Sequence, residues 1–282
     1  MSILNNWPAP AKLNLFLNIN GRRQDNYHEL QTLFQFIDIC DYLDFESRHD
    51  GKIMLLTDFD EVAHDDNLIV KAARILQQHT RTKLGANIWI KKKLPMGGGI
   101  GGGSSNAATT LVALNHLWQT GVSQEQLADL GLALGADVPI FVRGHAAYAE
   151  GVGEKFTDAN PEEYWYLVIV PQTHVSTAAV FSHPHLTRDS AKIDVSSLPR
   201  SKFKNDCQSL VTKLYPQVAK ALDWLLKYAP SRMTGTGACV FAEFSSEEEA
   251  VKVYQQLPKE FHGFLSRGCN RSPLLEKLTQ DS

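Results

Sequence analysis

The sequence predicts an α+β protein built in two halves, and three observations support this prediction. Several segments alternate apolar and polar residues, which is typical of strands, and others repeat apolar residues every three or four positions, which is typical of helices. This succession of strands and helices starts again near residues 155 to 160. At 282 residues the chain is long enough for one large or two medium domains. We therefore expect two domains, 1–156 and 157–282.

Composition excludes several classes of protein. The hydrophobic share of 43% and the charged share of 21% describe an ordinary soluble chain, and a net charge of -3 argues against a nucleic-acid or membrane-surface binder. The longest apolar runs, such as 164–170, are far too short to span a bilayer. The four cysteines form no C-x-x-C pair, so we expect buried thiols and a reducing cytoplasm.

The first predicted strand spans residues 11–20 and has one polar face. Its apolar and polar residues alternate, so Lys12 and Asn14 point to the same side, about 7 Å apart by strand geometry. Two interpretations stay open for this face: a solvated strand edge, or a surface that binds a ligand.

A polar turn at 21–26 leads into a second strand that ends near residue 37. Asn26 in this turn tolerates a positive φ angle. Asp66 or Asn67 then caps a helix. The other strands expected before the glycine-rich segment are 42–46, 52–57 and 86–91.

The strand at 86–91 runs into six glycines within seven positions, Gly97 to Gly103. Such a run loses much backbone entropy on folding, so it indicates positive φ angles or the close approach of a ligand. Helix-capping residue types follow at Ser104, Ser105 and Asn106, and a helical pattern begins there. No acidic residue lies between Gly97 and Gln124. The segment therefore predicts a phosphate site at a helix N-terminus, which we favour over a flexible linker.

Three better-known phosphate loops do not fit this segment. A dinucleotide fingerprint would need an acidic residue about 20 positions further on, and none is present there. A Walker A loop would have lysine where this chain has Ser104, and the protein-kinase motifs H-R-D and D-F-G are absent.

After the helix that follows the glycines, Ser123 caps a second helix that ends near Gly135, which fits a C-cap. Pro139 prevents that helix from continuing. Asp137 therefore lies in a tight turn between apolar stretches, where it either caps the next turn or serves a site. A strand at 146–150 ends this half.

The second half repeats the alternation. We expect strands at 165–170, 239–244 and 263–269, and helices at 176–181, 206–214, 217–228 and 246–257. Residues 182–204 are polar and predict a surface loop. Gly235, Thr236 and Gly237 predict either a hairpin turn or a second loop that closes on the phosphate site.

Three motifs now stand in order along the chain: 10–14 (PAKLN), 95–106 (PMGGGIGGGSSN) and 234–237 (TGTG). Their sequence and spacing resemble the GHMP kinase superfamily, whose members phosphorylate small alcohols with ATP. The resemblance implies an N-terminal domain like the second domain of ribosomal protein S5, a ferredoxin-like C-terminal domain, and a site between them.

Other segments resemble the branch of this superfamily whose alcohol, a methylerythritol, is linked to cytidine diphosphate and serves isoprenoid precursor synthesis without mevalonate. These segments are 25–28, 66–69, 134–141 and 150–154. The family often has glycine where this chain has Asn26. The alternatives are a superfamily kinase for mevalonate, homoserine or a sugar, and a non-catalytic sensor on the same fold.

The resemblance also implies roles for individual residues. Asp137 would be the base that deprotonates the substrate's 2-hydroxyl, and Lys12 would be its charged partner. Asn14 would orient the alcohol, Tyr27 and Phe181 would stack on the cytosine, and His28 would supply hydrogen bonds. Gly235, Thr236 and Gly237 would also contact the substrate.

ATP and Mg²⁺ are the implied cofactors, and Ser105 is a candidate metal ligand. The residues implied for ATP are Asn67, Pro95, Met96, Gly97, Gly98, Gly99, Ile100, Gly101, Gly102, Gly103, Ser104, Ser105 and Asn106. The expected partner is the small-molecule substrate, with no nucleic acid and no membrane, and the expected assembly is a monomer or a weak homodimer.

Overall fold

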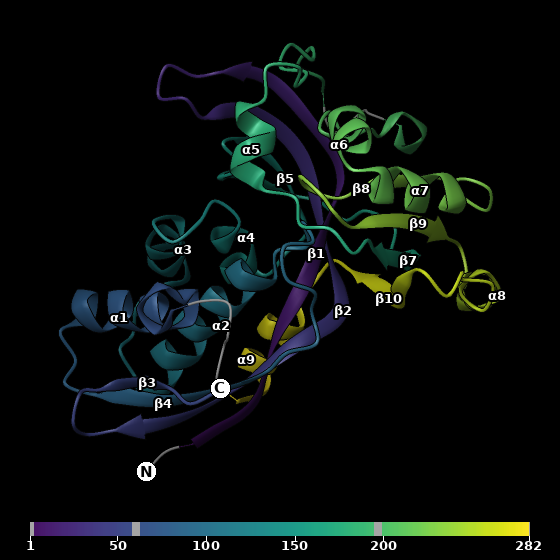
Figure 1. Cartoon of the computed structure of the whole chain (residues 1–282). Helices are drawn as coiled ribbons and strands as arrows, with labels where there is room; N and C mark the ends of the chain where they lie inside the picture. The colour runs from purple at the N-terminus through teal and green to yellow at the C-terminus, as the bar shows by residue number, and fades with distance from the viewer. Residues whose placement is uncertain (1–2, 58–62, 195–198, 282) are drawn as a thin grey trace.

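The computed structural model describes residues 3–57, 63–194 and 199–281. It has two lobes joined by two long strands, β1 (Ile3–Arg22) and β2 (His28–Arg48) (Figure 1). These strands pair along almost their whole length as an antiparallel ribbon, with several bulges. The sequence predicted shorter strands, and it split β2 into two at residues 37–42. The split was wrong because the polar residues there stay in the strand: Asp41 is fully buried and hydrogen-bonded.

The free edge of β2 connects the lobes. It pairs in turn with β5 (Ala147–Gly151), β10 (His262–Cys269) and β4 (Gly85–Lys91). Two short strands extend this sheet, β3 (Ile53–Leu55) beside β4 and β6 (Lys155–Asp158) beside β5. Because one strand carries partners from both lobes, the two halves share a single sheet. The division into 1–156 and 157–282 stays a prediction.

The first lobe packs helices on β1, β2 and β4: α1 (Leu68–Thr80), α2 (Gly102–Leu117), α3 (Gln124–Leu132) and α4 (Val138–Arg143), with a short 3₁₀ turn, η1 (His64–Asp66), before α1. Asn67, one of the two candidates, caps α1 with its side chain, and Ser123 caps α3 as the sequence predicted, where it also forms a capping box.

Two predicted helix boundaries were wrong. Helix α2 begins at Gly102 with Gly101 as its N-cap, so Ser104 to Asn106 lie inside its first turns. Helix α3 ends before Ala133, and Pro139 lies within α4 instead of stopping a helix. Proline fits the first turn of α4 because the backbone N–H of that position would have no helical partner.

The second lobe follows the order strand, helices, two strands, helix, strand. It contains β7 (Trp165–Val170), α5 (Thr177–Ser182), η2 (Arg200–Lys202), α6 (Gln208–Leu214), α7 (Pro216–Leu225), β8 (Ser231–Met233), β9 (Val240–Phe244) and α8 (Glu247–Tyr254), and ends at β10. The strand order β10-β7-β9-β8 is that of a ferredoxin-like sheet, as the resemblance implied. The sequence missed β8 because three residues carry no periodic signal.

The last helix, α9 (Pro273–Asp281), returns to the first lobe and packs on β1 and α2 (Figure 1). Leu274 belongs to the apolar core of that lobe. Neither α9 nor β6 was expected from the sequence.

The four cysteines are free thiols, and Cys40, Cys207 and Cys239 are buried as expected. Cys269 is partly exposed. Burial raises the pKa of each thiol to about 12, so none is a reactive thiolate at neutral pH. Within the described part of the chain, no helix has the length and apolar character needed to cross a membrane.

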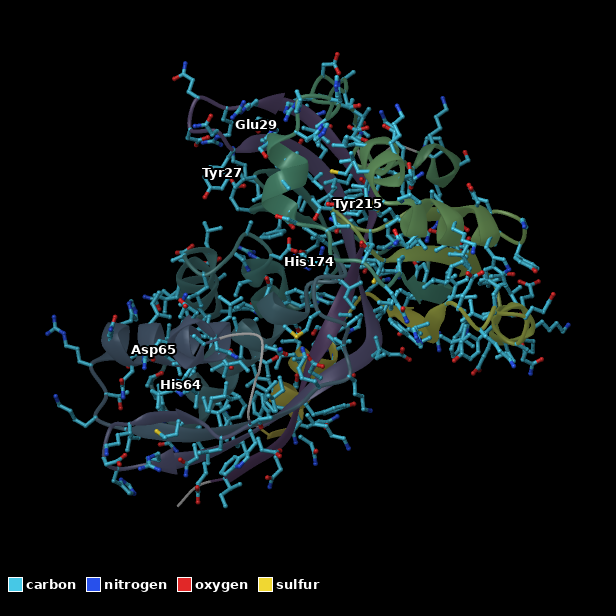
Figure 2. The ribbon with its side chains drawn as sticks, viewed as in Figure 1. Tyr27, Glu29, His64, Asp65, His174 and Tyr215 are labelled. Carbon is cyan, nitrogen blue, oxygen red and sulfur yellow. The ribbon has the colours of Figure 1, made fainter. Side chains whose placement is uncertain are left out.

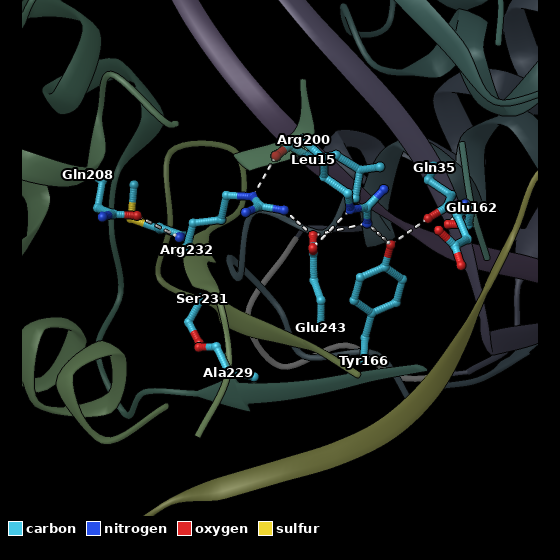
Figure 3. Close-up of polar contacts among 11 residues, drawn as sticks. Leu15, Gln35, Glu162, Tyr166, Arg200, Gln208, Ala229, Ser231, Arg232 and Glu243 are labelled. Carbon is cyan, nitrogen blue, oxygen red and sulfur yellow. Dashed lines mark hydrogen bonds and ion pairs between the residues drawn. The ribbon is translucent and has the colours of Figure 1, made fainter. Parts of the chain in front are cut away.

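A buried polar network joins the second lobe to the β1–β2 ribbon (Figure 3). Glu243 on β9 accepts hydrogen bonds from both Arg200 and Arg232. Arg232 also donates to the carbonyl oxygen of Leu15 on β1, and Arg200 donates to the hydroxyl of Tyr166. The network continues when Tyr166 donates to Gln35 on β2.

Removing Glu243 should therefore destabilise the protein strongly. Glu243→Ala leaves the buried guanidinium group of Arg232 and the partly buried one of Arg200 without their carboxylate, and breaking a buried ion pair in this way typically costs about 3–5 kcal/mol in the free energy of unfolding. The exposed pair Lys220–Glu260 provides a control, and Glu260→Ala should cost less than about 1 kcal/mol. Urea unfolding measures both variants, and equal losses would contradict a structural role for the network.

Candidate functional site

A cavity of about 870 Å³ is lined by both lobes and contains most of the residues predicted for the site. Those that line it are Lys12, Asn14, Tyr27, His28, Asn67, Pro95, Met96, Gly97 to Gly103 with Ile100, Ser104, Asn106, Asp137, Phe181, Gly235 and Thr236. Two predicted residues do not line it: Ser105 is fully buried in α2, and Gly237 is shielded from the cavity. Segments more than 200 residues apart in the chain thus meet around one space.

Lys12 lies at the centre of this site. Its Nζ donates to Asn14 Oδ1 at 2.6 Å and to the Gly99 carbonyl oxygen at 3.2 Å, and it lies 3.2 Å from Asp137 Oδ2. The side chain is only 3% exposed, so the alternative of a solvated strand edge is wrong for this residue. Its position beside Asn14 confirms the predicted polar face of β1.

Asp137 occupies the N-cap position of α4 but makes no capping hydrogen bond with its side chain. The capping role considered for it is therefore wrong. The carboxylate lines the cavity instead, and the side chain is 37% exposed. A carboxylate beside a buried ammonium group can accept a proton from a bound hydroxyl.

Two threonines that sequence reasoning did not assign to the site hold Asn14. The Asn14 side chain donates to Thr32 Oγ1 at 2.8 Å, and the Asn14 backbone N–H donates to Thr234 Oγ1 at 2.9 Å. Thr234 belongs to the third motif, but nothing in the sequence near Thr32 indicates this contact. These bonds connect β1 to β2 and to the second lobe.

Most of the glycines are required by protein contacts. A Cβ atom on Gly99 would lie 2.5 Å from the Thr234 carbonyl oxygen, and one on Gly98 would lie 2.6 Å from Cys239 Sγ. A Cβ on Gly97 would lie 2.8 Å from the ring of His174, which lies between the lobes in Figure 2. The loop is thus packed tightly against the second lobe.

The segment Gly235 to Gly237 is confirmed as a turn between strands, while its closing on a phosphate site stays a prediction. It connects the antiparallel neighbours β8 and β9, as a hairpin turn does. It also packs on the glycine loop, since a Cβ on Gly235 would lie 2.9 Å from the Gly99 carbonyl oxygen.

The N-terminus of α2 faces the cavity with its glycines and Ser104. Lys92 lines the same cavity and is paired with the buried carboxylate of Asp41, which also accepts hydrogen bonds from the backbone N–H groups of Lys93 and Leu94. Sequence reasoning missed Asp41, which fixes the chain where it enters the loop. A helix N-terminus with a nearby ammonium group suits a polyphosphate.

One end of the cavity is formed by Asn67, Pro95 and Met96. Asn67 Oδ1 accepts from the Ile69 N–H as the cap of α1, and its amide nitrogen can donate to a ligand. Met96 is 52% exposed and offers an apolar surface.

The other end carries three aromatic side chains. Tyr27 is 62% exposed on the β1–β2 hairpin, near α5 (Figure 2). The rings of His28 and Phe181 lie 5.0 Å apart. Asn26 has φ 70°, which confirms the expected positive angle. Arg188, which lies in the segment predicted as a surface loop, donates to His28 Nε2 at 3.0 Å and was not expected here.

No dedicated metal cluster is present among residues 3–57, 63–194 and 199–281, where no three His, Cys, Asp or Glu side chains are suitably grouped. Two oxygens in the first turns of α2, Ser105 Oγ and Asn106 Oδ1, are buried and have no hydrogen-bond partner among the described residues.

Comparison with known proteins agrees with this geometry. Residues 67–145 match the GHMP kinases N terminal domain, and residues 190–263 match the GHMP kinases C terminal family. The chain is 61% identical to a 4-diphosphocytidyl-2-C-methyl-D-erythritol kinase of Shewanella loihica and 60% identical to that of Shewanella halifaxensis, over 97% of each chain.

Solved structures give the same result. A crystal structure of 4-(cytidine 5'-diphospho)-2C-methyl-D-erythritol kinase matches with a TM-score of 0.80 at 26% identity, covering 95% of this chain and 99% of the other. A mevalonate kinase matches with a TM-score of 0.66 at 17% identity, covering 96% of this chain and 100% of the other, and so shares the fold.

The glycine contacts predict different effects for substitutions at Gly99 and Gly103. Gly99→Ala forces a positive φ of 75° on alanine and a clash with backbone, and should destabilise the protein by at least about 2 kcal/mol. Gly103 lies inside helix α2, and a Cβ atom there would meet only the flexible end of the Leu68 side chain, at 3.5 Å. Gly103→Ala should therefore leave the stability of the protein unchanged or raise it slightly. Thermal unfolding distinguishes the two, and an undiminished Tm for Gly99→Ala would contradict this account of the loop.

Proposed function

The chain belongs to the GHMP kinase family, and we infer from its site and its relatives that it transfers phosphate from ATP to the 2-hydroxyl of 4-diphosphocytidyl-2-C-methyl-D-erythritol. This reaction serves the non-mevalonate route to isoprenoid precursors. The observation that carries the inference is the layout of one cavity, with the glycine loop, the Lys12–Asp137 pair and the His28–Phe181 rings around it.

We propose that Asp137 is the general base and that Lys12 supports it. Phosphoryl transfer depends mainly on positioning and on neutralising negative charge. Lys12 holds the carboxylate beside the cavity and can also stabilise charge that develops on the attacking oxygen. Since Asp137 makes no capping bond in α4, its free oxygen can receive the hydroxyl proton.

ATP would lie with its phosphates at the glycine loop and the N-terminus of α2. Backbone N–H groups and the helix dipole favour the anion there, and the ammonium group of Lys92, which is paired with Asp41, lies on the wall of the same cavity. The adenine would lie towards Asn67, Pro95 and Met96, where an apolar surface and an amide donor are available.

Mg²⁺ would accompany ATP, and the orphaned oxygen of Asn106 fits its preference for oxygen ligands, whereas the predicted ligand Ser105 does not line the cavity. Asn106 is the better placed of the two because it lines the cavity. The ion would neutralise negative charge on the phosphate oxygens.

The cytosine would lie between Tyr27 and Phe181, where stacking contributes about 1–3 kcal/mol per base. Stacking accepts any base, so the hydrogen bonds of His28 would provide selectivity. Thr236, whose hydroxyl lies 2.8 Å from that of Thr177, and Gly235 would border the substrate. A cytoplasmic location, a monomer or weak homodimer, and the absence of nucleic-acid partners stay predictions.

The substrate can be tested by measuring ATP consumption with four alcohols: the cytidyl methylerythritol, mevalonate, homoserine and galactose. We expect turnover of the first alone. Turnover of another alcohol instead would favour a different kinase of the family, and no turnover at all would favour a sensor.

The base can be tested with Asp137→Asn, which preserves the size of the side chain. We expect ATP to bind as before while phosphorylation slows by at least about 100-fold, the usual contribution of general base catalysis. Asp129→Asn, at an exposed position on α3, provides the control. A rate for Asp137→Asn close to that of the control would show that another group takes the proton.

A further inference from the structure

Arg188 connects two walls of the cavity that are far apart in the chain. Its Nε donates to His28 Nε2 at 3.0 Å, across 160 positions of sequence. The two terminal nitrogens donate to the carbonyl oxygens of Phe181 at 2.7 Å, His183 at 2.8 Å and Leu186 at 3.2 Å. None of these four acceptors is a carboxylate: an imidazole nitrogen and three backbone carbonyl oxygens hold the guanidinium group in place.

This contact determines which nitrogen of His28 carries the proton. A guanidinium group can only donate, so His28 Nε2 must accept, and the proton of a neutral imidazole must then reside on Nδ1. The doubly protonated ring would direct an N–H group at another N–H group. The pKa of His28 is lowered by burial, and further by Arg188 and Arg22, which agrees with a neutral ring at pH 7.

The protonated nitrogen is the one available to a ligand. His28 lines the cavity, and His28 Nδ1 makes no hydrogen bond with any residue that the structure describes. The ring also lies against that of Phe181, whose carbonyl oxygen is bound by the same guanidinium. Arg188 therefore fixes both the donor and the neighbouring aromatic ring.

We propose that Arg188 is a positioning residue that sets base selectivity, by holding His28 as a neutral Nδ1–H donor towards the cytosine. The proposal rests on the cytidyl substrate inferred above. Cytosine presents acceptors at both O2 and N3, whereas uracil carries a hydrogen at N3. The O2 acceptor is common to both bases, so the selectivity arises when the fixed donor is aimed at N3, where it pairs with cytosine but meets an N–H group of uracil, which is costly in a buried site.

The tautomer can be measured directly on the whole free protein. Imidazole nitrogen NMR shifts of ¹⁵N-histidine-labelled protein distinguish a protonated from an unprotonated nitrogen. We expect protonated Nδ1 and unprotonated Nε2 for His28, and loss of this preference in Arg188→Met. Arg188→Lys should keep it, because an ammonium group also only donates. Lys192→Met, an exposed cation of the same segment, should change nothing.

Kinetics test the consequence for selectivity. In Arg188→Met we expect the KM for the cytidyl substrate to rise by about tenfold or more, and the preference for the cytidyl over the uridyl substrate to fall by a similar factor. The kcat and the KM for ATP should change by less than about threefold, because Arg188 contacts neither the base Asp137 nor the phosphate loop. Arg188→Lys should recover most of the preference.

The two experiments separate the proposals. A wild-type His28 that carries its proton on Nε2 overturns the role of Arg188, whatever the activity. An unchanged preference for cytidine in Arg188→Met also overturns it. If the wild-type protein does not phosphorylate the cytidyl substrate, the function is wrong, while the NMR measurement still decides the tautomer. If Arg188→Met does not fold, the wild-type tautomer and the Arg188→Lys kinetics decide instead.

Discussion

The buried ammonium group of Lys12 is the constraint on which the site depends. A charge taken out of water is costly unless it is paired and hydrogen-bonded. Lys12 meets this requirement with partners from three separate segments: Asn14 on β1, the Gly99 carbonyl in the glycine loop and Asp137 before α4. Movement of any one segment would leave the charge incompletely paired. The same contacts that stabilise the fold therefore hold the reacting groups in place.

The second lobe positions this charge without touching it. The hydroxyl of Thr234 accepts a hydrogen bond from the backbone N–H of Asn14. Arg232, two residues earlier, donates to the carbonyl oxygen of Leu15. Two adjacent residues of β1 are thus held by one short segment, which begins in β8. Because Arg232 is itself paired with the buried Glu243, the position of β1 depends on the core of the second lobe.

The sequence predicted features that leave a local pattern. The polar face of β1, the caps Asn67 and Ser123 and the helices of the second lobe follow from periodicity, and the order of the three motifs indicated the family. Thr32, Asp41 and Arg188 could not be predicted, because the site contacts that they make, to Asn14, Lys93 and His28, span 18, 52 and 160 positions of sequence and leave no periodic signal. The strand β8 was missed because it is short. The helix α9 does repeat apolar residues at helical spacing, at Leu274, Leu275 and Leu278, so it was overlooked although its pattern is present in the sequence.

The glycine loop shows where local reasoning reached the right place for an incomplete reason. We expected the glycines to provide positive φ angles or the close approach of a ligand, and Gly97, Gly99 and Gly101 do have positive φ angles. Protein contacts add a further reason, because Gly97, Gly98, Gly99 and Gly101 each lie where a Cβ would come within 3.0 Å of the protein itself. The loop is therefore fixed by His174, Cys239, Thr234 and Phe141. Amide groups held in this way pay little ordering cost when an anion binds. Close packing thus prepares the loop for phosphate, and the open positions, Gly102 and Gly103, are left at the start of α2 where the anion would lie.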